Sequence, residues 1–279
     1  MKISASYWMF EGGLEAKRPI AEAMQEAKDL GFDAIELAVA SQGVLRHNTT
    51  QAQCEDIIAD ADKIGIEISS VASGESWNCS PSANDPDVRK KIIDFTGKAL
   101  QVAGWLGVDA YLFVPGAVDV FFKPDYPPVP YDVVWERSLA ALKELAPYAE
   151  ENGVHICVEN VWNKFLLSPL EMRQFVDEIN SPYVGCYFDA GNVLLFGYPQ
   201  DWIRILGSRI KRVHIKGYKK GDHTLKGFCD LLKGDVPWKE VMKALKEVGY
   251  DGPVTAEMLP WKKGLIRRTS RAMDQILAM

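Results

Sequence analysis

The chain of 279 residues lacks the features that mark several common classes of protein. Its five cysteines are odd in number, far apart and never spaced as CxxC, which argues against a disulfide framework and favours a reducing, cytoplasmic setting. No stretch approaches the ~18 apolar residues of a membrane span. The polar and aromatic N-terminus, MKISASYWMFEGG, has no apolar core of the kind found in a signal peptide, so a membrane protein is not expected.

No block of like charges marks a surface for nucleic acid. Lys and Arg number 32 against 38 Asp and Glu, which gives a formal net charge of −6. Because a phosphate-backbone partner needs a basic face, nucleic-acid binding is disfavoured. A small phosphorylated ligand needs only one or two local cations and stays open. The glycines after the first predicted strand lack the GxGxxG spacing, so a dinucleotide site has little support.

Strand-like and helix-like segments alternate along the whole chain. Predicted strands begin at residues 2, 33, 67, 109, 155, 184, 210 and 253. Predicted helices follow them at residues 19–31, 50–64, 85–107, 131–152, 168–179, 199–207, 237–249 and 263–279. The strand spacing suits the roughly 30 or more residues of one β-α-β unit. Without a linker in the series, residues 1–279 are predicted to form one domain of the α/β class, a closed (β/α)₈ TIM barrel.

Two local features accompany this pattern. Ser168, Pro169 and Glu171 have the spacing of a helix capping box with proline in the first turn. A long loop is expected at residues 216–236, between the seventh strand and its helix. The sequence therefore predicts one helix start in detail and one unusually long connection.

Four predicted strands carry metal-ligating side chains at or near their C-terminal ends. They are Glu159 in HICVEN, Asp189 in YVGCYFDAGN, His214 in RIKRVHIKGY and Glu257 in GPVTAEM. In a closed barrel the C-terminal strand ends converge on one mouth, so these side chains could surround one divalent ion. Each residue alone has an ordinary explanation, such as a helix cap, a turn or a satisfied core histidine. Their common position favours the metal.

The same segments resemble the xylose-isomerase-like TIM-barrel superfamily, in its sugar-phosphate isomerase/epimerase branch. The resemblance rests on VEN at 158–160, FDAGN at 188–192, VHIKG at 213–217, LLKGDVPW at 231–238 and TAEM at 255–258. It implies that Glu159, Asp189, His214 and Glu257 bind one divalent metal ion, Mn²⁺, Co²⁺ or Mg²⁺. It also implies that Glu159 and Glu257 are the catalytic residues that move protons.

The resemblance implies a metal-dependent isomerase or epimerase of carbohydrate metabolism, acting on a small keto sugar or sugar phosphate. One glutamate could remove a carbon-bound proton, which would give a cis-enediolate. The other glutamate could then return a proton to the opposite face. Ketose 3-epimerases commonly have a histidine where this chain has Asn192, and often an arginine where it has Lys219 and Lys220. The departures leave the exact reaction open.

Three other hypotheses stay beside this one. The first is a lyase or dehydratase that uses the same enediolate to expel water or an alkoxide from a keto sugar, keto-inositol or 3-keto-glycoside. The second is a barrel that binds sugar without turnover. The third, a DNA-repair endonuclease on the same barrel, would need a histidine-rich site, and the chain has four histidines. The sequence leaves a homo-oligomer open.

Several residues near the four ligands are candidates for substrate contacts. Lys216 could neutralise a phosphate, stabilise the enediolate or pair with Asp189, Glu75 could meet a substrate hydroxyl, and Glu36 could orient a group behind the ligands. Asn160, Trp162 and Asn163 follow Glu159 into the mouth and, with Asn192, are expected to determine which substrate binds. Aromatic residues that could shape a sugar pocket, or simply pack between loops, are Trp8, Trp77, Phe113, Trp162 and Trp261.

Overall fold

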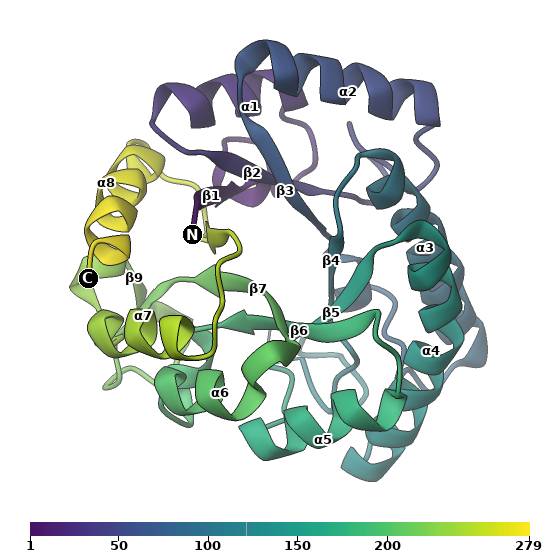
Figure 1. Cartoon of the computed structure of the whole chain (residues 1–279). Helices are drawn as coiled ribbons and strands as arrows, with labels where there is room; N and C mark the ends of the chain where they lie inside the picture. Colours follow the sequence, from purple (N-terminus) through teal and green to yellow (C-terminus); the bar gives the residue numbers. More distant parts are fainter. Residues whose placement is uncertain (121) are drawn as a thin grey trace.

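Eight parallel strands close into a barrel in a computed structural model that describes residues 1–120 and 122–279 (Figure 1). Their order around the barrel is β1-β10-β7-β6-β5-β4-β3-β2. The strands are β1 Ile3–Ser6, β2 Ala34–Ala38, β3 Glu67–Ala72, β4 Ala110–Phe113, β5 His155–Glu159, β6 Val184–Asp189, β7 Ile210–Ile215 and β10 Val254–Ala256. This arrangement confirms the predicted (β/α)₈ architecture.

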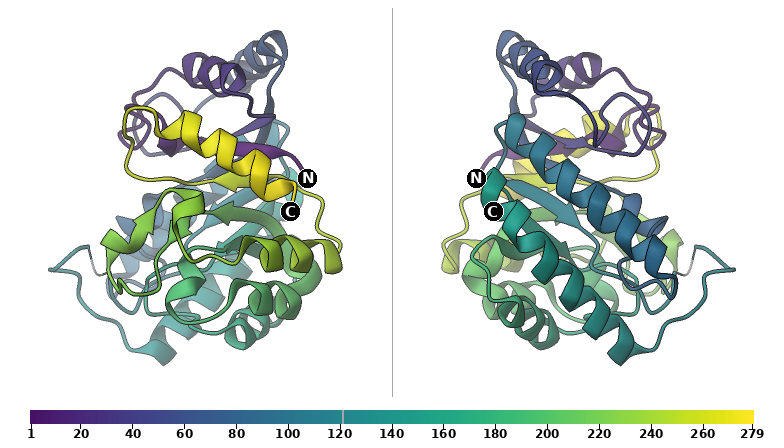
Figure 2. Two further views of the ribbon diagram at one scale, coloured as in Figure 1. Left: turned by 90° about the vertical axis from the view of Figure 1, so that its left-hand side faces the viewer. Right: turned by 90° about the vertical axis from the view of Figure 1, so that its right-hand side faces the viewer.

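Helices pack around the outside of the barrel, as the side views in Figure 2 show. They are α1 Ile20–Asp29, α2 Gln51–Ile64, α3 Pro86–Trp105, α4 Tyr131–Asn152, α5 Pro169–Ile179, α6 Pro199–Leu206, α7 Trp238–Glu247 and α8 Leu265–Leu277. The two chain ends lie near one another (Figures 1 and 2) because β1 pairs with β10 and so closes the barrel. Of the described helices, none has the length and apolar character needed to cross a membrane.

The strands are buried on both faces, and alternate residues serve two different cores. In β5, Ile156 and Val158 join the large apolar cluster between the barrel and its helices, whereas Cys157 joins a small cluster inside the barrel. Because side chains alternate along a strand, Glu159 points inward like Cys157. The pattern of β5 therefore delivers a carboxylate to the inside of the barrel at the C-terminal end of the strand.

The structure differs from the sequence prediction at two connections. The first strand, predicted over residues 2–8 from the segment KISASYW, ends at Ser6, because the Ser6 side chain accepts a hydrogen bond from the Trp8 backbone N–H (3.4 Å) and starts a 3₁₀ turn. The predicted loop at 216–236 contains a small antiparallel hairpin of β8 Gly217–Tyr218 and β9 Phe228–Cys229. Strands of two residues are too short to produce a periodic pattern in the sequence.

The predicted capping box at the start of α5 is confirmed. The Ser168 hydroxyl accepts the Glu171 backbone N–H (3.2 Å), and the Glu171 carboxylate accepts the Ser168 backbone N–H (3.1 Å). Pro169 occupies the first turn.

We expect Ser168→Ala to lower the free energy of unfolding by about 1 kcal/mol, measured by chemical denaturation. Ser208→Ala, at an exposed serine, is the control, and equal losses in the two variants would mean that the cap adds no stability.

Candidate active site

The four ligand candidates meet at the C-terminal end of the barrel. Glu159 and Asp189 end β5 and β6, His214 lies near the end of β7, and Glu257 directly follows β10. Asp189 lies opposite His214 in the register of β6 and β7. All four are buried, and one ligand atom from each lies within 4.8 Å of the others. Strand register thus brings together residues far apart in the sequence.

Each of these four residues also has one buried polar atom that makes no hydrogen bond. The atoms are Glu159 Oε1, Asp189 Oδ2, His214 Nδ1 and Glu257 Oε2. Two of these atoms, Asp189 Oδ2 and Glu257 Oε2, form ion pairs with Lys216. Leaving the other two without a partner costs free energy, and all four atoms converge. Carboxylate oxygens and an imidazole nitrogen are ligands that divalent metal ions accept. The cluster fits, and could hold, one metal ion.

The orientation of His214 is fixed from the far side of its ring. Its Nε2 lies 2.9 Å from Glu36 Oε1, and the other oxygen of Glu36 accepts hydrogen bonds from Ser70 (3.0 Å) and Tyr187. Because an ionised carboxylate can only accept, Nε2 carries a proton, and Nδ1 is the nitrogen that can bind a metal ion once it has lost its own proton. Nδ1 lies 3.5 Å from both Glu159 Oε1 and Glu257 Oε2. The buried Glu36 therefore presents the ligating nitrogen to the cluster.

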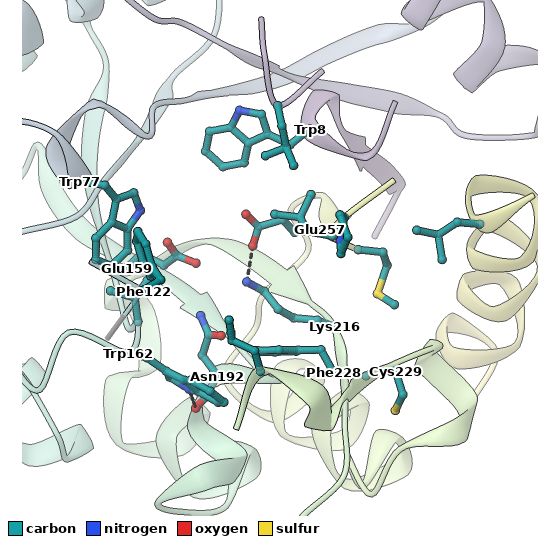
Figure 3. Close-up of a pocket in the computed structure, with 18 of the residues that line it drawn as sticks. Trp8, Trp77, Phe122, Glu159, Trp162, Asn192, Lys216, Phe228, Cys229 and Glu257 are labelled. Atoms are coloured by element: carbon teal, nitrogen blue, oxygen red, sulfur yellow. Dashed lines mark hydrogen bonds and ion pairs between the residues drawn. The ribbon is translucent and has the colours of Figure 1, made fainter. Parts of the chain in front are cut away.

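Lys216 places a positive charge among the carboxylates. Its Nζ lies 3.1 Å from Asp189 Oδ2 and also forms an ion pair with Glu257, as the dashed line in Figure 3 shows. Burial lowers the Lys216 pKa, but Asp189 and Glu257 outweigh it and raise the pKa above its ordinary value. Of the three roles considered for Lys216, pairing with Asp189 is present in the structure.

The chain comes close to itself where Lys216 meets the end of β6. A Cβ atom added to Gly191 would lie 2.7 Å from the Lys216 carbonyl oxygen and 2.8 Å from its Cγ. Only glycine allows this approach. The glycine of the FDAGN segment thus helps to place the lysine beside Asp189.

The two glutamates have opposite pKa shifts. Burial raises the pKa of Glu159 to about 7. Burial acts in the same direction on Glu257, but the charges of Lys216 and His214 outweigh it and lower its pKa to about 2. Burial also raises the pKa of Asp189. Near neutral pH one glutamate can therefore hold a proton while the other is ionised, which is the arrangement of an acid and a base.

A cavity of about 560 Å³ lies above this cluster. Glu159 and Glu257 line it together with three predicted substrate residues, Lys216, Asn192 and Trp162 (Figure 3). Of the aromatic candidates, Trp8 and Trp77 also line the cavity, whereas Phe113 and Trp261 do not.

Glu75 lies away from the main cavity. Its carboxylate accepts a hydrogen bond from the Ser41 backbone N–H (3.1 Å), and it lines a separate cavity of about 430 Å³ with His47. The loop after β3 carries Ser73 and Trp77 into the main cavity but turns Glu75 toward the second cavity. The structure does not bring Glu75 together with the other predicted site residues.

The structure places Asn160 and Asn163, which were expected to determine which substrate binds, against backbone groups and outside the cavity wall. The Asn160 side chain donates to the Asp189 carbonyl (2.9 Å) and accepts the Asp189 N–H (2.8 Å), so it joins two strand ends. Asn163 donates to the Gly116 carbonyl (2.7 Å). Both amides bond to buried backbone and neither lines the cavity.

Asn192 connects the aspartate to the aromatic wall. Its backbone N–H donates to Asp189 Oδ1 (2.7 Å), and its side-chain amide donates to the Asn160 carbonyl (3.0 Å). Its carbonyl accepts the indole N–H of Trp162 (3.0 Å). Trp162 is thereby held at the edge of the cavity, where it is in place to meet a ligand.

Part of the cavity wall was not foreseen from the sequence. It comes from two segments, the β8–β9 hairpin and the connection between β10 and α8. The residues are Leu225, Phe228, Cys229, Asp230, Met258, Leu259, Pro260, Lys262 and Leu265. No local motif marks these residues, because only the tertiary fold brings the two segments to the barrel mouth.

The contact between Glu36 and His214 yields a test. We expect Glu36→Gln to weaken Mn²⁺ binding about 10- to 100-fold, because the amide removes the charge that fixes the imidazole proton on Nε2. Binding would be measured by titration calorimetry on the folded variant. Glu67→Gln, at an exposed residue on β3, is the control. Unchanged affinity in Glu36→Gln would show that Glu36 does not orient a ligand.

Known proteins resemble the chain along most of its length. D-psicose 3-epimerase from Ruminiclostridium cellulolyticum is 27% identical over 263 residues, which cover 90% of this chain and 81% of that protein. L-ribulose-5-phosphate 3-epimerase from Escherichia coli is 24% identical over 253 residues, covering 90% and 86%. The crystal structure of D-psicose 3-epimerase with D-tagatose from Clostridium cellulolyticum H10 has a TM-score of 0.79 at 23% identity and covers 99% of each chain. Residues 24–275 match the family described as xylose isomerase-like TIM barrel, and the chain belongs to that family.

Proposed function

We propose that the protein is a divalent-metal-dependent isomerase or epimerase of a keto sugar or sugar phosphate. The observation that carries the proposal is the convergence of four buried metal-ligating side chains beside a cavity that two of them, Glu159 and Glu257, line. Two relatives, a D-psicose 3-epimerase and an L-ribulose-5-phosphate 3-epimerase, support this class of reaction. The reaction would proceed through a cis-enediolate of the sugar.

Glu159, Asp189, His214 and Glu257 would hold the ion, for which Mn²⁺, Co²⁺ and Mg²⁺ are the candidates. When bound, the ion would act as a Lewis acid that polarises the sugar carbonyl and acidifies the neighbouring C–H. Asp189 contributes no proton transfer in this scheme, because Asn192 and Lys216 already engage its two oxygens. The two glutamates are left to handle protons.

Glu257 would take the carbon-bound proton and Glu159 would return one to the opposite face. Before an ion binds, Glu257 is ionised, with a pKa of about 2, and Glu159, with a pKa of about 7, is the glutamate that can hold a proton. A substrate held between them would lose a proton on one side and gain one on the other. That exchange inverts the carbon centre, and the roles reverse in the opposite direction.

Lys216 would control the strength of Glu257 as a base. Its ammonium is the largest of the influences that lower the Glu257 pKa. An enediolate oxygen that attracts this ammonium would draw it away from Glu257. The pKa of the glutamate would then rise, and the carboxylate would become a better base. Lys216 would thus act by pairing with Glu257 before the reaction and with the enediolate oxygen during it.

The assignment of the acid–base pair is tested with solvent deuterium. We expect Glu257→Gln and Glu159→Gln each to slow exchange into a panel of ketoses by about 10²- to 10⁴-fold, because each loses a proton carrier. Glu240→Gln, at an exposed residue on α7, is the control. Exchange at the wild-type rate with unchanged Mn²⁺ affinity in Glu257→Gln would rule out its assigned roles.

The products of the same assay separate the reaction classes. Exchange with a changed stereocentre or a moved carbonyl supports the epimerase or isomerase. Loss of water or of an alkoxide from the substrate supports a lyase instead. Absence of exchange with Mn²⁺, Co²⁺ and Mg²⁺ would leave a protein that binds sugar without turnover.

Metal binding should depend on pH because protons compete for the ligands. Below about pH 7, Glu159 takes up a proton, and Glu36 and Glu257 raise the pKa of buried His214 despite its burial, so it too competes. We expect the apparent Mn²⁺ affinity to fall as the pH decreases through about 7.

At neutral pH, Mn²⁺ at about 100 times its Kd should stabilise the fold by about 2.7 kcal/mol. A melting temperature that chelator leaves unchanged would argue against a metal site.

A further inference from the structure

The cavity has two chemically different parts. Its floor carries the groups that can bond to sugar hydroxyls and to a carbonyl, Glu159, Asn192, Lys216 and Glu257. The remaining wall, from the β8–β9 hairpin and the connection to α8, is built mainly of aliphatic and aromatic side chains. Figure 3 shows Phe228 and Cys229 on this side of Lys216, and Trp77 and Trp162 on the other.

The apolar wall is preformed. The Phe228 ring packs against Trp162 (5.1 Å between ring centroids) and edge-on against Tyr218 (5.1 Å). Gly217 lets the two short strands approach, since a Cβ atom there would lie 2.3 Å from the Cys229 carbonyl oxygen. The wall therefore presents a fixed apolar surface next to the catalytic floor and does not need a ligand to assemble it.

Large apolar side chains also stay exposed at the mouth of the cavity. Leu14 is 49% exposed and Leu225 is 51% exposed, although both line the cavity. Exposed apolar groups that rim a pocket gain free energy when a ligand covers them. Sugar hydroxyls cannot bond to leucine. The rim is therefore suited to a ligand with an apolar part.

The charged residues of this wall do not form a phosphate site. Arg268 on α8 bonds to Asp230 (3.3 Å) and to the Lys263 carbonyl (3.5 Å). Phosphate recognition relies on arginine or lysine with free donors. Among the described residues that line the cavity there is no arginine, Lys216 is paired with carboxylates, and Lys262 is a single exposed lysine. A sugar phosphate would meet one lysine on this wall, together with Asp230 and leucines.

The volume leads to the same conclusion. A free ketohexose has about a dozen non-hydrogen atoms, and at the roughly 30 Å³ that a water molecule occupies it would fill at most about 360 Å³. The cavity measures about 560 Å³. The remaining space lies against apolar side chains, where ordered water would find few partners.

We propose that the substrate is a keto sugar that carries an apolar, ring-containing substituent. The sugar would lie on the floor, and the substituent would lie against the wall between Leu225, Phe228 and Met258. The sugar part of this inference rests on the proposed function. The apolar substituent is inferred independently, from the residues of the wall. Free ketoses and sugar phosphates would then bind less tightly than the substituted sugar.

The test compares two glycosides of the same 3-keto sugar that differ only in the group on the anomeric oxygen, methyl or phenyl. Binding to the Mn²⁺-loaded protein is measured by titration calorimetry, with a ketose phosphate as a third ligand. We expect the phenyl glycoside to bind at least about tenfold more tightly than the methyl glycoside, because the ring covers the apolar wall. The ketose phosphate should bind more weakly than the phenyl glycoside.

Two leucine variants locate the binding of the ring. Leu225→Ser should reduce the preference for phenyl over methyl by about threefold or more. Leu170→Ser, on α5, is the matched control, since Leu170 is 56% exposed and does not line the cavity, and it should leave the preference unchanged. Equal affinities for the two glycosides, tighter binding of the ketose phosphate, or a preference that Leu225→Ser leaves intact would each overturn the inference.

Failure of this inference can be told apart from failure of the proposed function. If free ketoses exchange deuterium and the phenyl group brings no gain, the enzyme class stands and the substrate class is wrong. If the phenyl glycoside is preferred but no carbon-bound proton exchanges in any ligand, the apolar wall stands and the isomerase or epimerase is wrong.

Discussion

The burial of several carboxylates at one end of the barrel is the constraint on which the rest of the site depends. Glu159, Asp189 and Glu257 are all buried within a few ångströms of one another, and like charges taken out of water repel strongly. Lys216 offsets part of this cost by ion pairs with Asp189 and Glu257, and His214, when protonated, by its contacts with Glu159 and Glu257. The carboxylates respond differently, since Glu159 gains proton affinity and Glu257 loses it. Two glutamates with opposite pKa shifts thus arise from one unfavourable cluster.

The barrel makes this cluster tolerable because it holds the charged groups on rigid strands. Glu36, on β2, reaches across the interior to His214 on β7, and Tyr187 and Ser70 bond to the same carboxylate. Asn160 joins the ends of β5 and β6 through the Asp189 backbone. None of these contacts touches the space where a ligand would bind. They fix the directions in which the candidate metal-ligating atoms point, and these directions stay the same whichever substrate occupies the cavity.

The sequence was sufficient to predict the barrel and the clustering of the four candidate ligands, for a common physical reason. Strand periodicity sets which face Glu159 occupies, and barrel closure sets which strand ends meet, so both follow from patterns within single segments. The cap at Ser168 is equally local. The backbone contacts of Asn160 and Asn163 could not be predicted, because an amide can bond either to a ligand or to a neighbouring backbone, and the choice depends on another strand. Glu75 and the β8–β9 hairpin depend on loop paths, which leave no periodic signal.

The division between strands and loops also separates the candidate ligands from the apolar wall. The candidate ligands belong to strand ends, whose positions the closed sheet determines, whereas the apolar wall belongs to connections that can change without disturbing the sheet. Phe228 links the two parts, because its ring packs on Trp162 and lies 5.8 Å from the ammonium of Lys216. A ligand that covers Phe228 would also shield Lys216 from water and strengthen its charge interactions. Occupation of the wall would therefore affect the proton balance of Glu257 as well as affinity.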